Sequence, residues 1–190
     1  TVFEEVKDKL EEGISLMGEI VGYTTSGSAI QGGWDYGCIP YAPDSLDIPH
    51  LPQHRFLVYR VTYTDPKGHV KEFTQDEIYN YCKTHNIESV GYLFQGTAGE
   101  YYNHKSKIPF GTPVTIENFS NVFFNLLKDE VESLGNCRYC KNKVPAEGYV
   151  IRTEDDDTGK IEWFKLKASS FLLKESQQLD KEEVDIESEN

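Results

Sequence analysis

Two lysines, Lys165 and Lys167, stand two positions apart in the segment FKLKA. In a strand, side chains alternate between two faces, so both ammonium groups would point to one side, with Phe164, Leu166 and Ala168 pointing to the core on the other. Two like charges side by side repel each other, and an anion with several negative oxygens between them removes the repulsion. The spacing therefore makes phosphate a candidate ligand for the two lysines.

A carboxylate lies in the segment expected to pair with this strand. Glu147 stands directly before Gly148 in the segment EGYVIR, and glycine lets backbone or ligand approach closely. A carboxylate near two lysines and a polyphosphate is typical of a Mg²⁺ site, because this ion prefers a carboxylate together with phosphate oxygens and water. The spacing leaves open a second interpretation, a solvated hairpin face with cross-strand Glu–Lys pairs.

Two further residues are candidates for contacts with a nucleoside. Glu19, in LMGEIVGY, needs a hydrogen-bond partner if its neighbours are buried, and a sugar hydroxyl is one choice. Tyr59, in FLVYRVT, has an aromatic face that suits a base. An edge-strand glutamate in solvent and a core tyrosine are the alternatives that spacing alone leaves open.

Hydrophobic periodicity and turn residues predict the elements that position these side chains. Expected helices span residues 2–12, 75–85, 116–134 and 170–178, and expected strands span 14–23, 56–64, 70–73, 147–153 and 160–167. The turn Asp65-Pro-Lys-Gly68 joins two of these strands directly. Because consecutive strands follow one another through short turns, we expect an α+β fold with mainly antiparallel β-sheets and flanking helices.

Composition narrows the class of protein. Hydrophobic residues make up 38% and aromatic residues 13% of the chain, as in a globular fold. The apolar runs are too short to span a bilayer and no secretion signal is visible, so we expect a cytoplasmic protein without membrane contact. Cys137 and Cys140 have zinc-knuckle spacing but no second ligand pair nearby, which favours free thiols and leaves zinc binding open.

The net charge of −13 differs from the basic footprint usual for nucleic-acid-binding proteins. Residues 180–190 carry six acidic side chains and one lysine, which is −5 and leaves −8 for the rest. We expect this segment to be an acidic disordered tail. Contact with nucleic acid then depends on the local field around a few lysines or on basic residues outside this sequence.

Four segments together resemble the RNA ligase family of covalent nucleotidyltransferases, close to the phage RNA ligase 2 branch. In chain order, MGEIVGY resembles motif III, FLVYRVT motif IIIa, AEGYVIR motif IV and FKLKASSF motif V. The resemblance covers roughly residues 14–176. It implies that residues 1–179 form part of a nucleotidyltransferase domain of the ATP-grasp-like ligase type.

The resemblance also implies an activity and a role for each matching residue. The activity is ATP-dependent joining of RNA 3′-OH and 5′-phosphate ends, with Mg²⁺, through enzyme–AMP and RNA-adenylate intermediates. Glu19 would contact the ribose hydroxyls of ATP, and Tyr59 would stack on adenine, where the family usually has phenylalanine. Glu147 would help to hold the metal, and Lys165 and Lys167 would bind the α-phosphate and stabilise its charge during transfer.

The sequence departs from the family pattern at two points. Arg60 follows the aromatic residue where the branch has an acid. No lysine is followed by glycine three positions later, so the Lys-x-x-Gly nucleophile of the family is absent. We therefore expect the enzyme to continue N-terminally of Thr1, and this chain alone to be inactive as an ATP-dependent ligase, because it cannot adenylylate itself. A sheet edge exposed by such a truncation would favour a dimer.

The same residues fit other interpretations. A DNA ligase or an mRNA capping guanylyltransferase shares the covalent lysyl–nucleotide chemistry. A non-catalytic binding module derived from such an enzyme would keep the motif residues as relics. The residues upstream of Thr1 distinguish these, since a Lys-x-x-Gly sequence there supports an enzyme.

Overall fold

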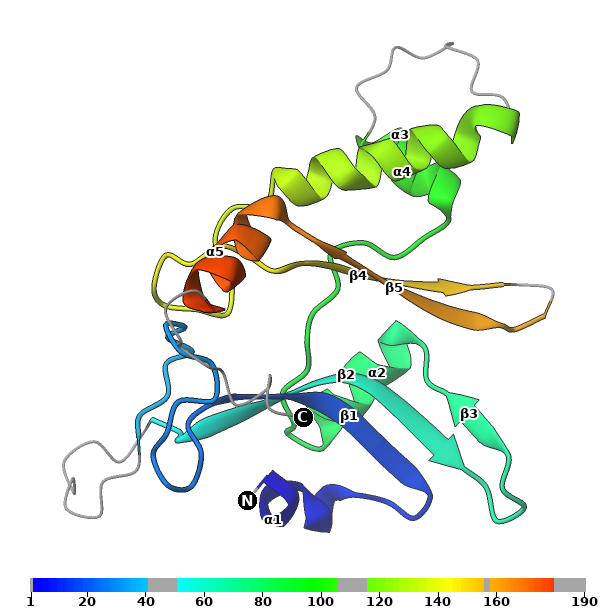
Figure 1. Cartoon of the computed structure of the whole chain (residues 1–190). Coiled ribbons are helices and arrows are strands. Elements are labelled where there is room, and N and C mark those ends of the chain that lie inside the picture. The colour runs from blue at the N-terminus through cyan, green and yellow to red at the C-terminus, as the bar shows by residue number, and fades with distance from the viewer. Residues whose placement is uncertain (1, 41–50, 106–115, 156–157, 180–190) are drawn as a thin grey trace. The chain divides into compact units, whose positions relative to one another are not determined.

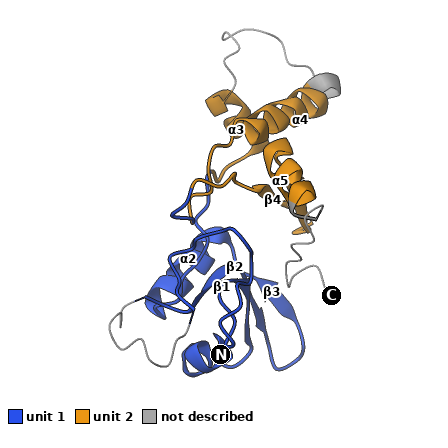
Figure 2. Ribbon diagram, turned by 60° about the vertical axis from the view of Figure 1, so that its left-hand side comes forward, with its two compact units in different colours: residues 1–93, 140–142, 184–190 blue, residues 94–139, 143–183 orange. Residues whose placement is uncertain are grey.

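The computed structural model describes residues 2–40, 51–105, 116–155 and 158–179 (Figure 1). These residues form two compact units, coloured separately in Figure 2. The first unit contains the described residues up to Leu93 together with Cys140–Asn142, and the second contains the remaining described residues from Phe94 onward. The segment 180–190, predicted to be a disordered tail, lies outside the described residues.

The first unit is built on a three-stranded antiparallel sheet in the order β1-β2-β3. The strands are β1 (Ile14–Gly22), β2 (His54–Thr64) and β3 (Val70–Glu72). The turn between β2 and β3 forms as predicted. Its Gly68 amide donates to the Asp65 carbonyl at 2.9 Å, and Gly68 adopts a φ of 86°. The sheet thus places Glu19 and Tyr59 on neighbouring strands.

One helix packs on this sheet and forms the core of the unit. α2 (Gln75–Thr84) begins with the predicted capping box, in which the Thr74 hydroxyl accepts from the Glu77 amide and the Glu77 carboxylate accepts from the Thr74 amide. Ile78 and Cys82 of this helix are fully buried against strand residues. Preceding the sheet are α1 (Val2–Val6) and a 3-10 turn (Lys7–Lys9), so the first helix is shorter than the predicted 2–12.

The second unit combines helices with a two-stranded antiparallel hairpin. Its elements are α3 (Ala98–Lys105), α4 (Ile116–Glu132), β4 (Gly148–Glu154), β5 (Ile161–Lys167) and α5 (Ser169–Leu179). α3 was not predicted, since it lacks a clear apolar face. Its N-terminal signal is nevertheless present, because Thr97 and Glu100 exchange the two hydrogen bonds of a capping box.

These elements confirm the predicted α+β class with antiparallel sheets and flanking helices. That residues 1–179 form part of a nucleotidyltransferase domain stays a prediction. Among the described residues, none of the helices has the length and apolar character needed to cross a bilayer.

Candidate functional site

The hairpin of the second unit brings three of the predicted residues together. Lys165 pairs in register with Val150 and Lys167 with Gly148, so both lysines extend from one face of β5. Glu147 precedes β4 on the opposite arm. Its Oε1 lies 2.7 Å from Lys165 Nζ and 3.7 Å from Lys167 Nζ. One carboxylate thus contacts two ammonium groups, and half of the Lys165 side chain remains exposed.

The base of this hairpin is held by the backbone. The Ala168 amide donates to the Glu147 carbonyl at 2.8 Å, and Ala168 is fully buried. A Cβ at Gly148 would lie 1.8 Å from the Leu166 carbonyl oxygen, and Gly148 adopts a φ of 156°, which favours glycine. Glycine therefore permits the close approach of the two arms that puts Glu147 beside the lysines.

Only part of the opposite face of β5 is covered. Leu166 is half-buried beside the buried Ala168, as predicted, but Phe164 is 51% exposed, so its assignment to the core was wrong. Tyr149, the cross-strand partner of Leu166, lies near Glu130, and burial raises the pKa of its hydroxyl. The covered part of this face is therefore near the base of the hairpin, at the same end of β5 as Lys167 but on the other side of the strand.

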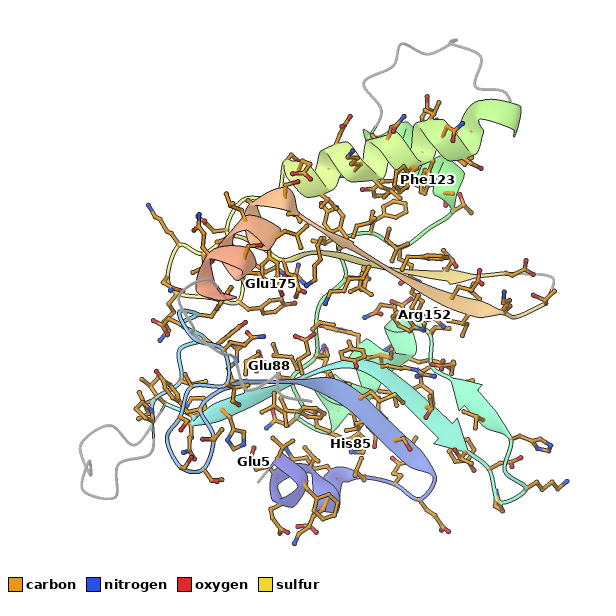
Figure 3. All side chains as sticks on the ribbon, viewed as in Figure 1. Glu5, His85, Glu88, Phe123, Arg152 and Glu175 are labelled. Carbon is orange, nitrogen blue, oxygen red and sulfur yellow. The ribbon has the colours of Figure 1, made fainter. Side chains whose placement is uncertain are left out.

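α5 begins directly after β5 and contributes a second carboxylate. The Ser169 hydroxyl donates to Glu132 Oε1 at 2.7 Å, which ties the start of α5 to the end of α4. Glu175, labelled in Figure 3, accepts from Lys167 Nζ at 3.1 Å and 3.3 Å through its two oxygens. The Lys167 ammonium also lies 5.2 Å from the centre of the Phe171 ring, a cation–π contact.

The first unit contains the two other candidates. Glu19 lies in β1 opposite Leu57 and is exposed. In β2, Val58 pairs with Gly18 and Arg60 pairs with Met17, so Tyr59 between them is the extra residue of a β-bulge. Bulges redirect side chains and recur beside functional sites. Tyr59 is 39% exposed, which contradicts a core position and leaves its ring accessible.

Arg60 has a structural partner next to this bulge. Its Nε donates to Glu72 Oε1 of β3 at 2.8 Å, its Nη2 contacts the same oxygen, and its Nη1 lies 3.4 Å from Met17 Sδ. The hydrogen bond to Glu72 raises the pKa of the guanidinium further above its ordinary value. Arg60 therefore links β1, β2 and β3 through side chains.

The sequence model of the family described as RNA ligase matches residues 2–167. The chain belongs to the RNA ligase family. A search of curated proteins finds no match to it.

In this RNA ligase family member, the match covers every predicted site residue. The structure brings Glu147, Lys165 and Lys167 into contact within the second unit, whereas Glu19 and Tyr59 belong to the first unit. The roles predicted for these five residues stay predictions.

Sequence reasoning missed Glu175 and Phe171. A signal for them exists, since residues 171 and 175 are four positions apart in the predicted helix and so share one face. The approach of that face to Lys167 depends on how the chain turns between β5 and α5, which no local pattern specifies.

Within the described ranges, no group of three or more His, Cys, Asp or Glu side chains is placed to hold a metal ion. Cys137 and Cys140 form no disulfide within the described residues and are half-buried. The carboxylate suited to a metal beside the two lysines is Glu147. A single carboxylate fits Mg²⁺, which commonly takes most of its remaining ligands from phosphate and water.

Proposed function

We propose that this chain carries the phosphate-binding and nucleoside-binding residues of an ATP-dependent RNA ligase. The observation that supports the proposal most directly is the contact of Glu147 with Lys165 and Lys167 on one face of the hairpin. Membership in the RNA ligase family supports the ligase chemistry. The proposed reaction joins an RNA 3′-OH to a 5′-phosphate.

The two lysines act on the α-phosphate of ATP in this proposal. Attack on the α-phosphorus forms a bond to AMP and breaks the bond to pyrophosphate, and negative charge builds on the oxygens around phosphorus. Two ammonium groups 2.7 Å and 3.7 Å from a shared carboxylate oxygen are already oriented toward one point, so they stabilise that charge without large rearrangement. Lys165 and Lys167 are the proposed catalytic residues, together with Glu147.

Glu147 has a second proposed task. Its carboxylate would hold Mg²⁺ in the presence of nucleotide, and the ion would supply positive charge to the phosphate oxygens. The carboxylate also keeps the two ammonium groups together when no phosphate is bound. Both tasks use the negative charge of the carboxylate.

The nucleoside part of ATP is assigned to the first unit. Glu19 would accept hydrogen bonds from the ribose hydroxyls, and Tyr59 would stack on adenine. The exposure of both side chains and the bulge at Tyr59 support this assignment. The Arg60–Glu72 pair would then fix the bulge rather than contact ATP.

The nucleophile is not among these residues. In the family chemistry a lysine of a Lys-x-x-Gly motif takes AMP, and no lysine of this sequence fits that motif. We therefore propose that this chain does not label itself with AMP. The final step needs no such lysine, because the RNA 3′-OH attacks the 5′-phosphorus of an RNA-adenylate, loses its proton, and AMP leaves.

The joining step can therefore be tested on this chain separately from self-adenylylation. The chain is incubated with Mg²⁺, a 5′-adenylylated RNA and a 3′-OH acceptor RNA, without ATP, and joined product is measured on a gel. We expect joined RNA, and no acid-stable label on the chain from α-labelled ATP. Parallel reactions with adenylylated DNA and acceptor DNA distinguish an RNA ligase from a DNA ligase.

Matched lysine variants test the site itself. Lys165→Ala and Lys167→Ala should each lower the joining rate by about 100-fold, the usual loss when one charge-stabilising group is removed. Lys160→Ala is the control, because Lys160 stands on the same hairpin and pairs with Glu162 at 2.6 Å. Failure to join RNA-adenylate would contradict the ligase proposal. Unchanged rates in both test variants would contradict the phosphate role.

A further inference from the structure

Lys167 has a closer carboxylate partner than Glu147. Glu175 lies 3.1 Å and 3.3 Å from its Nζ through its two oxygens, while Glu147 Oε1 lies 3.7 Å away. Phe171, one helical turn before Glu175, covers the ammonium with its ring. All of these residues belong to the second unit, so the arrangement depends on no contact with the first.

The charges of the two lysines and the two glutamates at this site balance. Lys165 and Lys167 contribute two positive charges, and Glu147 and Glu175 contribute two negative charges. A phosphate therefore meets no net positive charge among these four groups. Its oxygens also need the ammonium hydrogens of Lys167, of which there are three, and Glu175 already takes hydrogen bonds from that nitrogen.

We propose that Glu175 is an internal competitor for the nucleotide phosphate. Its carboxylate occupies Lys167 in the absence of nucleotide and gives way when the phosphate binds. Glu175 thereby keeps the lysine near its working position and lowers the affinity of the site for phosphate. This inference rests on the proposed phosphate role of Lys167.

The position of Glu175 suits such an exchange. Its side chain is 44% exposed, so the carboxylate is readily hydrated once it leaves Lys167. Glu147 also contacts Lys165, at 2.7 Å, so it keeps a partner in the site when the phosphate takes Lys167. Of the two acids, Glu147 is thus the fixed partner and Glu175 the displaceable one.

Glu175→Gln removes the negative charge of this side chain but leaves its contact with Lys167 possible. Glutamine has nearly the same size and keeps a carbonyl oxygen for Lys167, but it carries no charge. We expect the dissociation constant for AMP to fall by about twofold to fivefold, the range typical of partly exposed ion pairs. The dissociation constant for adenosine should stay unchanged, because adenosine has no phosphate. The gain for AMP should shrink as salt is raised.

Calorimetric titration of the whole chain with AMP and with adenosine measures both constants. The control is Glu162→Gln, which removes the same charge from an ion pair with Lys160 on the same hairpin and should change neither constant. Unchanged or weaker AMP binding by Glu175→Gln would overturn the inference, as would equal changes for AMP and adenosine.

The same titrations separate this inference from the proposed function. If the unmodified chain binds AMP no more tightly than adenosine, the proposed phosphate site itself is wrong. If it prefers AMP and Lys167→Ala removes the preference, the site stands. The response of Glu175→Gln then decides the role of Glu175 alone.

Discussion

Replacing Gly148 with alanine tests whether the close approach of β4 to β5 holds Glu147 beside the lysines. The added Cβ would lie 1.8 Å from the Leu166 carbonyl oxygen and 2.9 Å from Lys167 Cα, both backbone atoms. No side-chain rotation relieves such contacts. The arms must therefore separate by more than 1 Å, roughly the gap between 1.8 Å and an ordinary contact of about 3.4 Å.

Two effects determine how much Gly148→Ala lowers the free energy of unfolding of the second unit. Holding alanine at a φ of 156° costs about 1–3 kcal/mol. Separation of the arms also weakens hydrogen bonds at the base of the hairpin, among them the one from the Ala168 amide to the Glu147 carbonyl, at about 1 kcal/mol each. We expect the free energy of unfolding of the second unit to fall by about 2–4 kcal/mol.

Urea unfolding followed by circular dichroism measures this loss, and AMP titration measures the site. Gly135→Ala is the matched control, since its Cβ would meet nothing within 4 Å and Gly135 has no positive φ. We expect that control to unfold and bind AMP like the parent chain. If Gly148→Ala unfolds at the parent urea concentration and binds AMP equally well, the reasoning about the hairpin is refuted.

Two further predictions concern the first unit. Burial raises the pKa of the Cys82 thiol to about 11 from an ordinary 9.0, so its neutral form is favoured in the folded state and stability should fall as pH rises from about 9 to about 11. Urea unfolding across that range should show a drop of up to about 2 kcal/mol that Cys82→Ala lacks, and equal pH profiles would contradict the burial effect. Arg60→Met should lower the free energy of unfolding by about 1–2 kcal/mol, because Glu72 loses its partner. Adding Glu72→Gln should restore part of that loss, and full independence of the two changes in a double-mutant cycle would show that the pair contributes nothing.

Local patterns in the sequence were sufficient for much of the fold. The alternation that put Lys165 and Lys167 on one face is a property of any strand, and the register confirms it. The capping box at Thr74 depends on residues three positions apart, and it forms as predicted. Alternation also placed Phe164 opposite the lysines, but it could not say whether anything covers that face, and Phe164 is half exposed.

Only the tertiary structure decided the finer composition of the site. Tyr59 is exposed because a bulge adds one residue to β2, and bulges depend on how two strands align. Arg60 of β2 donates to Glu72 of β3, the strand that follows the β2–β3 turn. Lys167 donates to Glu175 because α5 starts directly after β5. A sequence specifies which side chains alternate or share a helical face through local geometry. The partners that meet across elements depend on strand register and chain direction, which arise from packing of the whole unit.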